Sequence, residues 1–183
     1  MSILFINACV RKNSRTLVLA KHILSEMSGE VIEVNLNREH IAPLNRELLE
    51  KRERLLNDEN KNDPMFYYAT QFAKADEIVI AAPFWDLSFP AMLKIYMEHV
   101  TVSGITFAYI NGIPSGLCKA KRLTYITTSG GPIFADFGYE YIKTLAKSFY
   151  GISQTKAYRV MNLDVNIITA EELLKKAEIS VVE

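Results

Sequence analysis

Short apolar runs alternate with helical patterns along this chain, and each run has the length of a buried strand. The first run, Ser2–Asn7, is followed by Leu17, Ala20, Leu24 and Met27, whose spacing predicts an amphipathic helix that ends near Gly29. A strand buried on both faces reads as such a continuous apolar run. Four more strands are predicted, at Glu30–Asn35, Glu77–Ala82, Arg122–Thr127 and Ala157–Leu163.

Helical patterns fill most of the space between these runs. Helices are predicted over residues 47–60, 64–74 and 90–100, along a stripe from Ile142 to Phe149, and over a last short stretch marked by Ala170, Leu173, Leu174 and Ala177. Ser88 is the expected cap of the helix that reaches Val100, with Pro90 in its first turn. Two segments interrupt the alternation: a polar helical insert at about 37–63, and a hairpin excursion at about 104–116 with Asn111-Gly112 as its turn.

Five strands alternating with helices predict an α/β fold with a doubly wound parallel sheet and helices on both faces. Open sheets of this kind bind ligands outside the carboxyl ends of the strands, where the strand order reverses. In the order 2-1-3-4-5, the ends of the first, third and fourth strands lie side by side at that point. The loops that follow them, residues 8–16, 83–89 and 128–134, are the candidate site.

Composition narrows the classes of function. The chain has 183 residues, which suits a single domain at 1–183, and 49% of them are hydrophobic, which excludes a disordered chain. Lys plus Arg and Asp plus Glu both number 21, so the net charge of zero argues against nucleic acid as a partner and is compatible with self-association.

Two cysteines, Cys9 and Cys118, cannot form a disulfide scaffold and suit a reducing compartment. No apolar run is long enough to cross a membrane, and the N-terminus does not have the pattern of a signal peptide. We therefore expect a cytoplasmic protein that does not associate with membranes.

The first loop contains Arg11, Ser14, Arg15 and Thr16 and opens a helix directly after a buried strand. Helix N-termini present unpaired N–H groups and attract anions, so this loop is a candidate phosphate site. The alternative is an ordinary helix cap with solvated cations. A second alternative comes from Cys9 and Arg15, whose C-x5-R spacing matches the cysteine phosphatases, although the loop has no glycine to wrap around a phosphate.

The second and third loops have the residues of a seat for a flat ring. Pro83–Pro90 contains Trp85 and two phenylalanines, which form an apolar wall unless Trp85 and Phe89 pack into the core. The paired glycines Gly130 and Gly131 let a ring approach the backbone, unless they only make a tight turn. A phosphate seat, an aromatic wall and a Gly-Gly seat together fit FMN, which also explains why the sequence contains no evident catalytic side chains. The three histidines have no metal-ligand spacing, so no metal is expected.

With these motifs, NACVRKNSRT, APFWDLSFPAMLKIYMEHV with GITFAY, and TTSGGP, residues 2–165 resemble the flavodoxin-like NAD(P)H:quinone oxidoreductases, specifically the FMN-dependent NADH-azoreductase branch. The resemblance implies a flavodoxin-like FMN-binding domain and no catalytic side chains, because the flavin carries the chemistry. The implied FMN-binding residues are Arg11, Ser14, Arg15, Thr16, Pro83, Phe84, Trp85, Asp86, Leu87, Thr128, Ser129, Gly130 and Gly131.

The same resemblance implies the reaction and the assembly. NADH or NADPH would deliver a hydride to FMN, and a quinone or azo compound would then take two electrons by ping-pong logic. The family's substrate pocket lies at the interface of a homodimer, and Phe107 and Tyr109 are its candidate lining here, unless the hairpin only covers the core. Asp86 departs from an asparagine that is usual in the family. A flavodoxin-type electron carrier is the alternative within flavin chemistry, although such carriers are usually strongly acidic.

Overall fold

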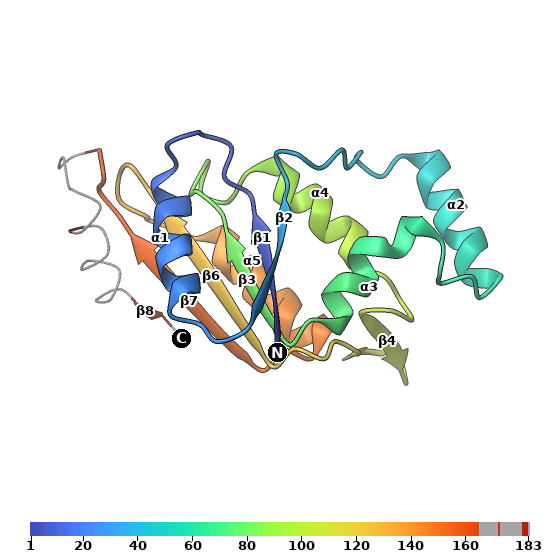
Figure 1. Ribbon diagram of the computed structural model, residues 1–183. Helices are drawn as coiled ribbons and strands as arrows, with labels where there is room; N and C mark the ends of the chain where they lie inside the picture. The colour runs from blue at the N-terminus through green and yellow to red at the C-terminus, as the bar shows by residue number, and fades with distance from the viewer. Residues whose placement is uncertain (165–171, 173–180, 183) are drawn as a thin grey trace.

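The computed structural model describes residues 1–164, 172 and 181–182, and its framework is one six-stranded sheet (Figure 1). The order is β2-β1-β3-β6-β7-β8, in which the first five strands are parallel. The strands are β1 (Ser2–Asn7), β2 (Glu30–Asn35), β3 (Glu77–Ala81), β6 (Arg122–Thr128), β7 (Gln154–Val160) and β8 (Val181–Val182). The parallel part confirms the predicted order 2-1-3-4-5.

Two features at the last edge of the sheet differ from the predictions. β7 begins and ends three residues earlier than predicted, because Gln154 donates to Lys121 at 3.0 Å and Asn162 adopts a left-handed φ of 62° that ends extended structure. Met161, predicted inside the strand, lies beyond it and is 40% exposed. The antiparallel β8, which pairs with Ala157 and Tyr158, was not predicted. The predicted last helix over 170–177 lies outside the described residues.

The alternation of side chains in β1 builds one core cluster on each face of the sheet. Leu4 and Ile6 join the larger cluster, while Ile3 and Phe5 join the cluster on the other face. Because both sets are buried, the strand needs apolar residues at every position, which is why it reads as a continuous run.

Helices cover both faces of the sheet. α1 (Arg15–Ser25) packs Leu19 and Ala20 on one face and lies in front in Figure 1. The other face is covered by α3 (Tyr67–Lys74), α4 (Ala91–Val100) and α5 (Phe137–Leu145), which the π-helix η2 (Ala146–Tyr150) continues. Between them they contribute Phe72, Leu93, Tyr96, Tyr139, Ile142 and Ala146 to the larger cluster.

The predicted cap of α4 is wrong. The N-cap residue is Pro90, and no side chain caps this helix. Ser88 instead exchanges two backbone hydrogen bonds with Trp85 in the preceding turn. The carbonyl of Pro90 accepts a hydrogen bond from the N–H of Leu93 at 2.9 Å, and the helix begins without a hydroxyl cap.

The predicted polar insert contains α2 (Arg46–Asn57), an exposed helix with no fully buried residue, which projects at the end of the molecule farthest from α1 (Figure 1). Asn45 caps it by accepting a hydrogen bond from the N–H of Leu48 at 2.9 Å. The short 3-10 helix η1 (Pro64–Phe66) then leads into α3.

The predicted hairpin consists of β4 (Phe107–Ile110) and β5 (Ile113–Gly116), paired antiparallel. Asn111 (φ 51°) and Gly112 (φ 78°) form its two-residue turn, and positive φ at both positions is what Asn-Gly favours. The hairpin packs on η2, with the rings of Phe107 and Phe149 5.1 Å apart.

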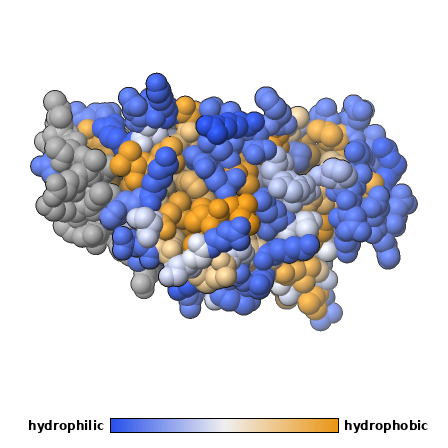
Figure 2. Space-filling view, viewed as in Figure 1, coloured by the Kyte–Doolittle hydropathy of each residue, from blue (hydrophilic) through white to orange (hydrophobic). Residues whose placement is uncertain are grey.

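The surface is of mixed character on the side that Figure 2 shows. An apolar patch lies in the middle of this side. The edge strand β2 exposes Val31 (42%) and Ile32 (40%). Among the described residues, no helix is long and apolar enough to span a membrane.

Candidate functional site

The loops after β1, β3 and β6 lie side by side, since these three strands are neighbours in the sheet. Thr128, at the end of β6, links all three. Its hydroxyl lies 2.7 Å from the hydroxyl of Thr16, and its carbonyl accepts a hydrogen bond from the N–H of Phe84 at 3.1 Å. The structure therefore brings the three predicted loops together at one edge.

The first loop ends in a helix start that is suited to an anion. Ser14 caps α1, accepting from the N–H of Leu17 at 3.2 Å, and both Ser14 and Thr16 are buried. The N–H groups of Arg15 and Thr16 lie in the first turn, where an α-helix supplies no partner for them. Arg11 is exposed on the loop before the cap.

Arg15 has partners that the sequence did not predict. Its guanidinium donates to the carbonyl of Leu163 at 2.7 Å and to the carboxylate of Asp164 at 2.5 Å. Arg15 thus links the start of α1 to the segment after β7 rather than lying free at the helix N-terminus. No motif in the sequence marks Asp164 for this contact.

The second loop is built around a tight turn from Trp85 to Ser88, closed by two backbone hydrogen bonds of 3.0 and 2.8 Å. Its central residues, Asp86 (φ 49°) and Leu87 (φ 65°), are both left-handed. Leucine in this region costs roughly 1–2 kcal/mol. Such strain persists only where the surroundings hold it, which is common at ligand sites.

The aromatic residues of the second loop divide into two groups. Phe89 packs on the core, with its ring 5.7 Å from that of Tyr141. For this residue, the alternative prediction of packing into the core is the correct one. Pro83, Phe84 and Trp85 are half-buried and lie beside the turn, while Asp86 and Leu87 are exposed at its tip. An apolar wall therefore remains available at the strand end.

The third loop is held by its own backbone and by the segment after β7. The hydroxyl of Ser129 donates to the carbonyl of Gly131 at 2.5 Å, and Asp164 donates its N–H to the carbonyl of Gly130 at 3.0 Å. A Cβ at Gly130 would collide with the Asp164 carboxylate, whereas a Cβ at Gly131 would meet nothing within 4 Å. Gly131 therefore offers open space for a flat ring, and Gly130 is covered.

Cys9 is not arranged as a nucleophile. It is 6% exposed, and its thiol points at the carbonyl of Ala81, with a sulfur–oxygen distance of 3.8 Å. Burial raises the pKa of the Cys9 thiol to about 11, so the thiolate is scarce at neutral pH. Together with the pairing of Arg15 with Asp164, this geometry argues against the phosphatase alternative.

The two residues predicted to line the substrate pocket lie elsewhere in this chain. Phe107 is buried against Phe149, while Tyr109 is 60% exposed on the hairpin. The hairpin packs on η2, whereas the N-terminus of α5 touches the second loop through the N–H of Phe137. The nine residues of α5 alone span about 14 Å, and η2 continues beyond them, so the two places lie at opposite ends of this helical segment. Within one chain, the hairpin and the three loops do not meet.

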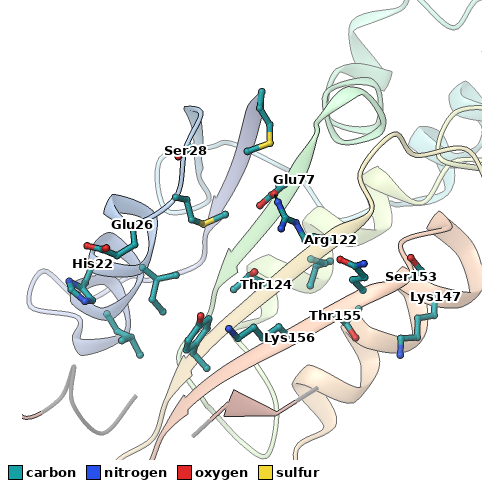
Figure 3. A pocket seen from close by; sticks show the side chains of 17 residues that line it. His22, Glu26, Ser28, Glu77, Arg122, Thr124, Lys147, Ser153, Thr155 and Lys156 are labelled. Atoms are coloured by element: carbon teal, nitrogen blue, oxygen red, sulfur yellow. Dashed lines mark hydrogen bonds and ion pairs between the residues drawn. The ribbon is translucent and has the colours of Figure 1, made fainter. Parts of the chain in front are cut away.

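A pocket of about 910 Å³ lies between α1 and the amino-terminal halves of β3, β6 and β7 (Figure 3). Its lining includes His22 and Glu26 of α1, Lys156 of β7, and the ion pair between Arg122 and Glu77. It lies at the opposite end of the strands from the three loops, so size alone does not make it the site of chemistry. No group of three or more metal-ligating side chains gathers anywhere in the described ranges.

Comparison with known proteins finds similar sequences over nearly the whole chain. A family profile described as a flavodoxin-like fold matches residues 1–183. An FMN-dependent NADH:quinone oxidoreductase of Clostridium perfringens is 35% identical over 184 residues, covering 95% of this chain and 92% of that protein. A protein of the same name from Lachnoclostridium phytofermentans is 34% identical, covering 96% and 93%.

Solved structures also superpose on nearly the whole chain. The FMN-dependent NADH-azoreductase of Bacillus anthracis strain Ames Ancestor, in complex with FMN, superposes with a TM-score of 0.79 at 25% identity, covering 97% of this chain and 94% of that one. An azoreductase of Bacillus anthracis strain Sterne has a TM-score of 0.82 at 20% identity, with 98% of each chain covered, and at that identity it supports the fold alone.

Proposed function

The chain belongs to the flavodoxin-like family, and from that premise we propose that it is an FMN-dependent NADH:quinone oxidoreductase that reduces quinones or azo compounds. The FMN-dependent relatives cover nearly the whole chain, so the proposal concerns residues 1–183 as a single FMN-binding domain. The junction of three loops at Thr128 is the observation that carries it.

The residues at this junction fit FMN at both of its ends. The buried hydroxyls of Ser14 and Thr16 and the first-turn N–H groups of α1 would hold the phosphate, with Arg11 nearby. At the other end, the open space at Gly131 would admit the edge of the ring. Arg15 and Gly130 fit less directly, because Asp164 engages both of them.

Bound FMN would supply two-electron chemistry, by which NADH, a proton and a quinone become NAD⁺ and a hydroquinone. The chain's own part is to bind and position. Phe84 and Trp85 would lie beside the ring and exclude water from it, and the backbone N–H groups of Gly130 and Gly131 would stabilise negative charge at its edge. Asp86 is exposed at the tip of its turn, so its carboxylate can remain solvated.

The proposal extends to assembly and location. A homodimer is supported by the apolar side chains that the hairpin exposes at Tyr109, Ile110 and Ile113. In such a dimer, the hairpin of one chain would place its Tyr109 at the substrate pocket of the other chain. Cytoplasmic location is supported by two free, buried cysteines, Cys9 and Cys118.

The test is the visible spectrum of the purified protein with FMN. We expect the wild type to bind FMN, to lose the flavin absorbance anaerobically on addition of NADH, and to regain it with a quinone. Gly131→Val should lower FMN affinity by about tenfold or more, because its side chain fills the ring seat. Its unfolding temperature should stay near that of the wild type, since a Cβ at this position meets no atom within 4 Å.

Glu53→Val, on the exposed helix α2, is the control and should bind FMN normally. Wild-type protein that fails to bind FMN would overturn the proposal. FMN that binds but is not reduced by NADH would indicate an electron carrier that needs a separate reductase.

A further inference from the structure

Three large apolar side chains stand exposed on the second loop and on the segment that leads from the third loop into α5. Phe134 is 87% exposed, Phe137 is 63% exposed, and Leu87 is 43% exposed. Burying such side chains away from water would stabilise the fold, so their exposure leaves that stabilisation unused. We call these three residues the apolar rim. Their exposure calls for an apolar partner.

The rim is fixed rather than loose. Asp136, between the two phenylalanines, caps α5 by accepting from the N–H of Tyr139 at 2.8 Å. Its other carboxylate oxygen lies 2.8 Å from the guanidinium of Arg159 on β7, and the Asp136 side chain is only 6% exposed. The backbone that presents the two rings outward is therefore anchored to the sheet.

A backbone contact joins the two halves of the rim. The N–H of Phe137 donates to the carbonyl of Leu87 at 3.0 Å, which sets the start of α5 against the left-handed turn of the second loop. Phe134 lies in the same connection as Gly131, the open position of the ring seat. The rim thus borders the place where the proposed cofactor would expose its ring.

From this arrangement we propose that Phe134 and Phe137, together with Leu87, bind the apolar rings of the electron acceptor and so determine which acceptors the enzyme prefers. The inference rests on the proposed function. A flat aromatic acceptor packs well on phenylalanine rings. Its apolar area is buried against them, and ring–ring contacts add to the binding. The rim would therefore favour acceptors with fused or substituted rings over small polar ones.

The experiment compares two acceptors in steady-state kinetics: 2-methyl-1,4-naphthoquinone, which has two fused rings, and ferricyanide, which has no apolar ring. In the double variant Phe134→Ser with Phe137→Ser, kcat/KM for the naphthoquinone should fall roughly 10- to 30-fold, mainly through KM, because the ring contacts are lost. The value for ferricyanide should stay within about twofold of the wild type, because ferricyanide has no ring to bury.

Two variants make the result specific. Phe134→Leu with Phe137→Leu should recover most of the naphthoquinone activity, since the rim stays apolar. Tyr67→Ser, which removes another ring with 59% exposure on the distant helix α3, should leave both acceptors unchanged. FMN affinity and the rate of flavin reduction by NADH, measured before any acceptor is added, should be the same in all variants.

Equal losses with both acceptors, or no loss with either, would overturn the inference. A shift of the serine variant to a smaller assembly in analytical ultracentrifugation, with both activities reduced, would assign the rim to a subunit contact and also overturn it. Failure of the proposed function is distinguished at an earlier step, because wild-type flavin would then not be reduced by NADH at all.

Discussion

Cys9 and Arg15 show how two side chains with a catalytic spacing can serve the fold instead. The Cys9 thiol lies at the end of β1 among apolar atoms, and the Arg15 guanidinium reaches across to Leu163 and Asp164. A cysteine phosphatase needs a thiolate and an arginine that both face the phosphate. Here burial disfavours the thiolate, and the arginine connects two loops.

Native Cys9 should therefore be inert. Because burial raises its pKa to about 11 and the pKa of Cys118 to about 12, an aromatic disulfide reagent at pH 8 should label neither thiol in the native protein. After denaturation in guanidinium chloride, both thiols of the chain should react. Cys9→Ser should retain FMN-dependent quinone reduction.

The same preparation should not hydrolyse p-nitrophenyl phosphate. Rapid labelling of the native protein that is absent in Cys9→Ser, or phosphate release that depends on Cys9, would restore the phosphatase alternative.

At the scale of elements, one carboxylate joins the starts of three strands. Asp76, just before β3, accepts from the N–H of Ser2 on β1 at 2.7 Å, and its other oxygen lies 2.6 Å from the ammonium of Lys119, just before β6. The Lys119 contact, followed by the Ser2 N–H, lowers the pKa of Asp76 from 3.8 to about 2. The ionised form is thus favoured in the folded state.

This lowered pKa predicts the sign of an acid effect. A carboxyl with a depressed pKa in the folded state adds stability above its unfolded value of 3.8, and that contribution is lost as the pH falls toward 2. Asp76→Asn should therefore lower the unfolding temperature at pH 7. The difference from wild type should shrink below pH 4 and be small near pH 2, as measured by circular dichroism.

Glu50→Gln, on the exposed face of α2, is the matched control and should follow the wild type at every pH. A difference between Asp76→Asn and wild type that stays constant from pH 7 to pH 2 would contradict the assignment.

β1 and β2 were both predicted to the residue, but only β1 owes this to burial. β1 is an apolar run buried on both faces of the sheet, whereas the first four residues of β2 are exposed at the sheet edge. β7 was placed three residues late because its first half, Gln154 to Lys156, is polar and joins the sheet through pairing with β6. Sequence pattern reports side-chain burial, whereas pairing across a sheet depends on residues distant in the chain.

The candidate site also has a part that the sequence predicts and a part that only the fold creates. Three loops at adjacent strand ends follow from the strand order, which the alternation of elements indicated. The contact of Arg15 with Asp164, the left-handed Leu87 and the backbone bond from Phe137 to Leu87 have no local signature. Each joins positions that only the folded sheet brings together, so each was found in the structure alone.

At the scale of the whole molecule, the apolar hairpin tip and the three loops lie at opposite ends of α5 and η2. The tip exposes Ile110 (57%) and Ile113 (69%), beside the exposed ring of Tyr109. Such a patch on a chain with no net charge favours association with a second copy. We expect the hairpin to lie in the interface of the proposed homodimer.

The variant Ile110→Asp with Ile113→Asp should therefore be monomeric in analytical ultracentrifugation at concentrations where the wild type is a dimer. Burying two carboxylates in an apolar contact is costly, and the like charges also repel. FMN affinity should change little if the cofactor binds within one chain, and quinone reduction should fall if a partner's hairpin completes the pocket.

Val18→Asp, at a position 44% exposed on α1, is the control and should remain a dimer. Wild-type protein that sediments as a monomer, or a dimer unaffected by the hairpin variant, would remove the hairpin from the interface.

The turn at Asp86 and Leu87 has a consequence for how fast a ligand can enter. Two left-handed residues without glycine keep their shape only because hydrogen bonds at Trp85, Ser88 and Phe137 hold them there. The conformational entropy of this loop is therefore already lost when the protein folds, before a ligand arrives. Association at this edge should then follow a single diffusional step, with no slow rearrangement to limit it.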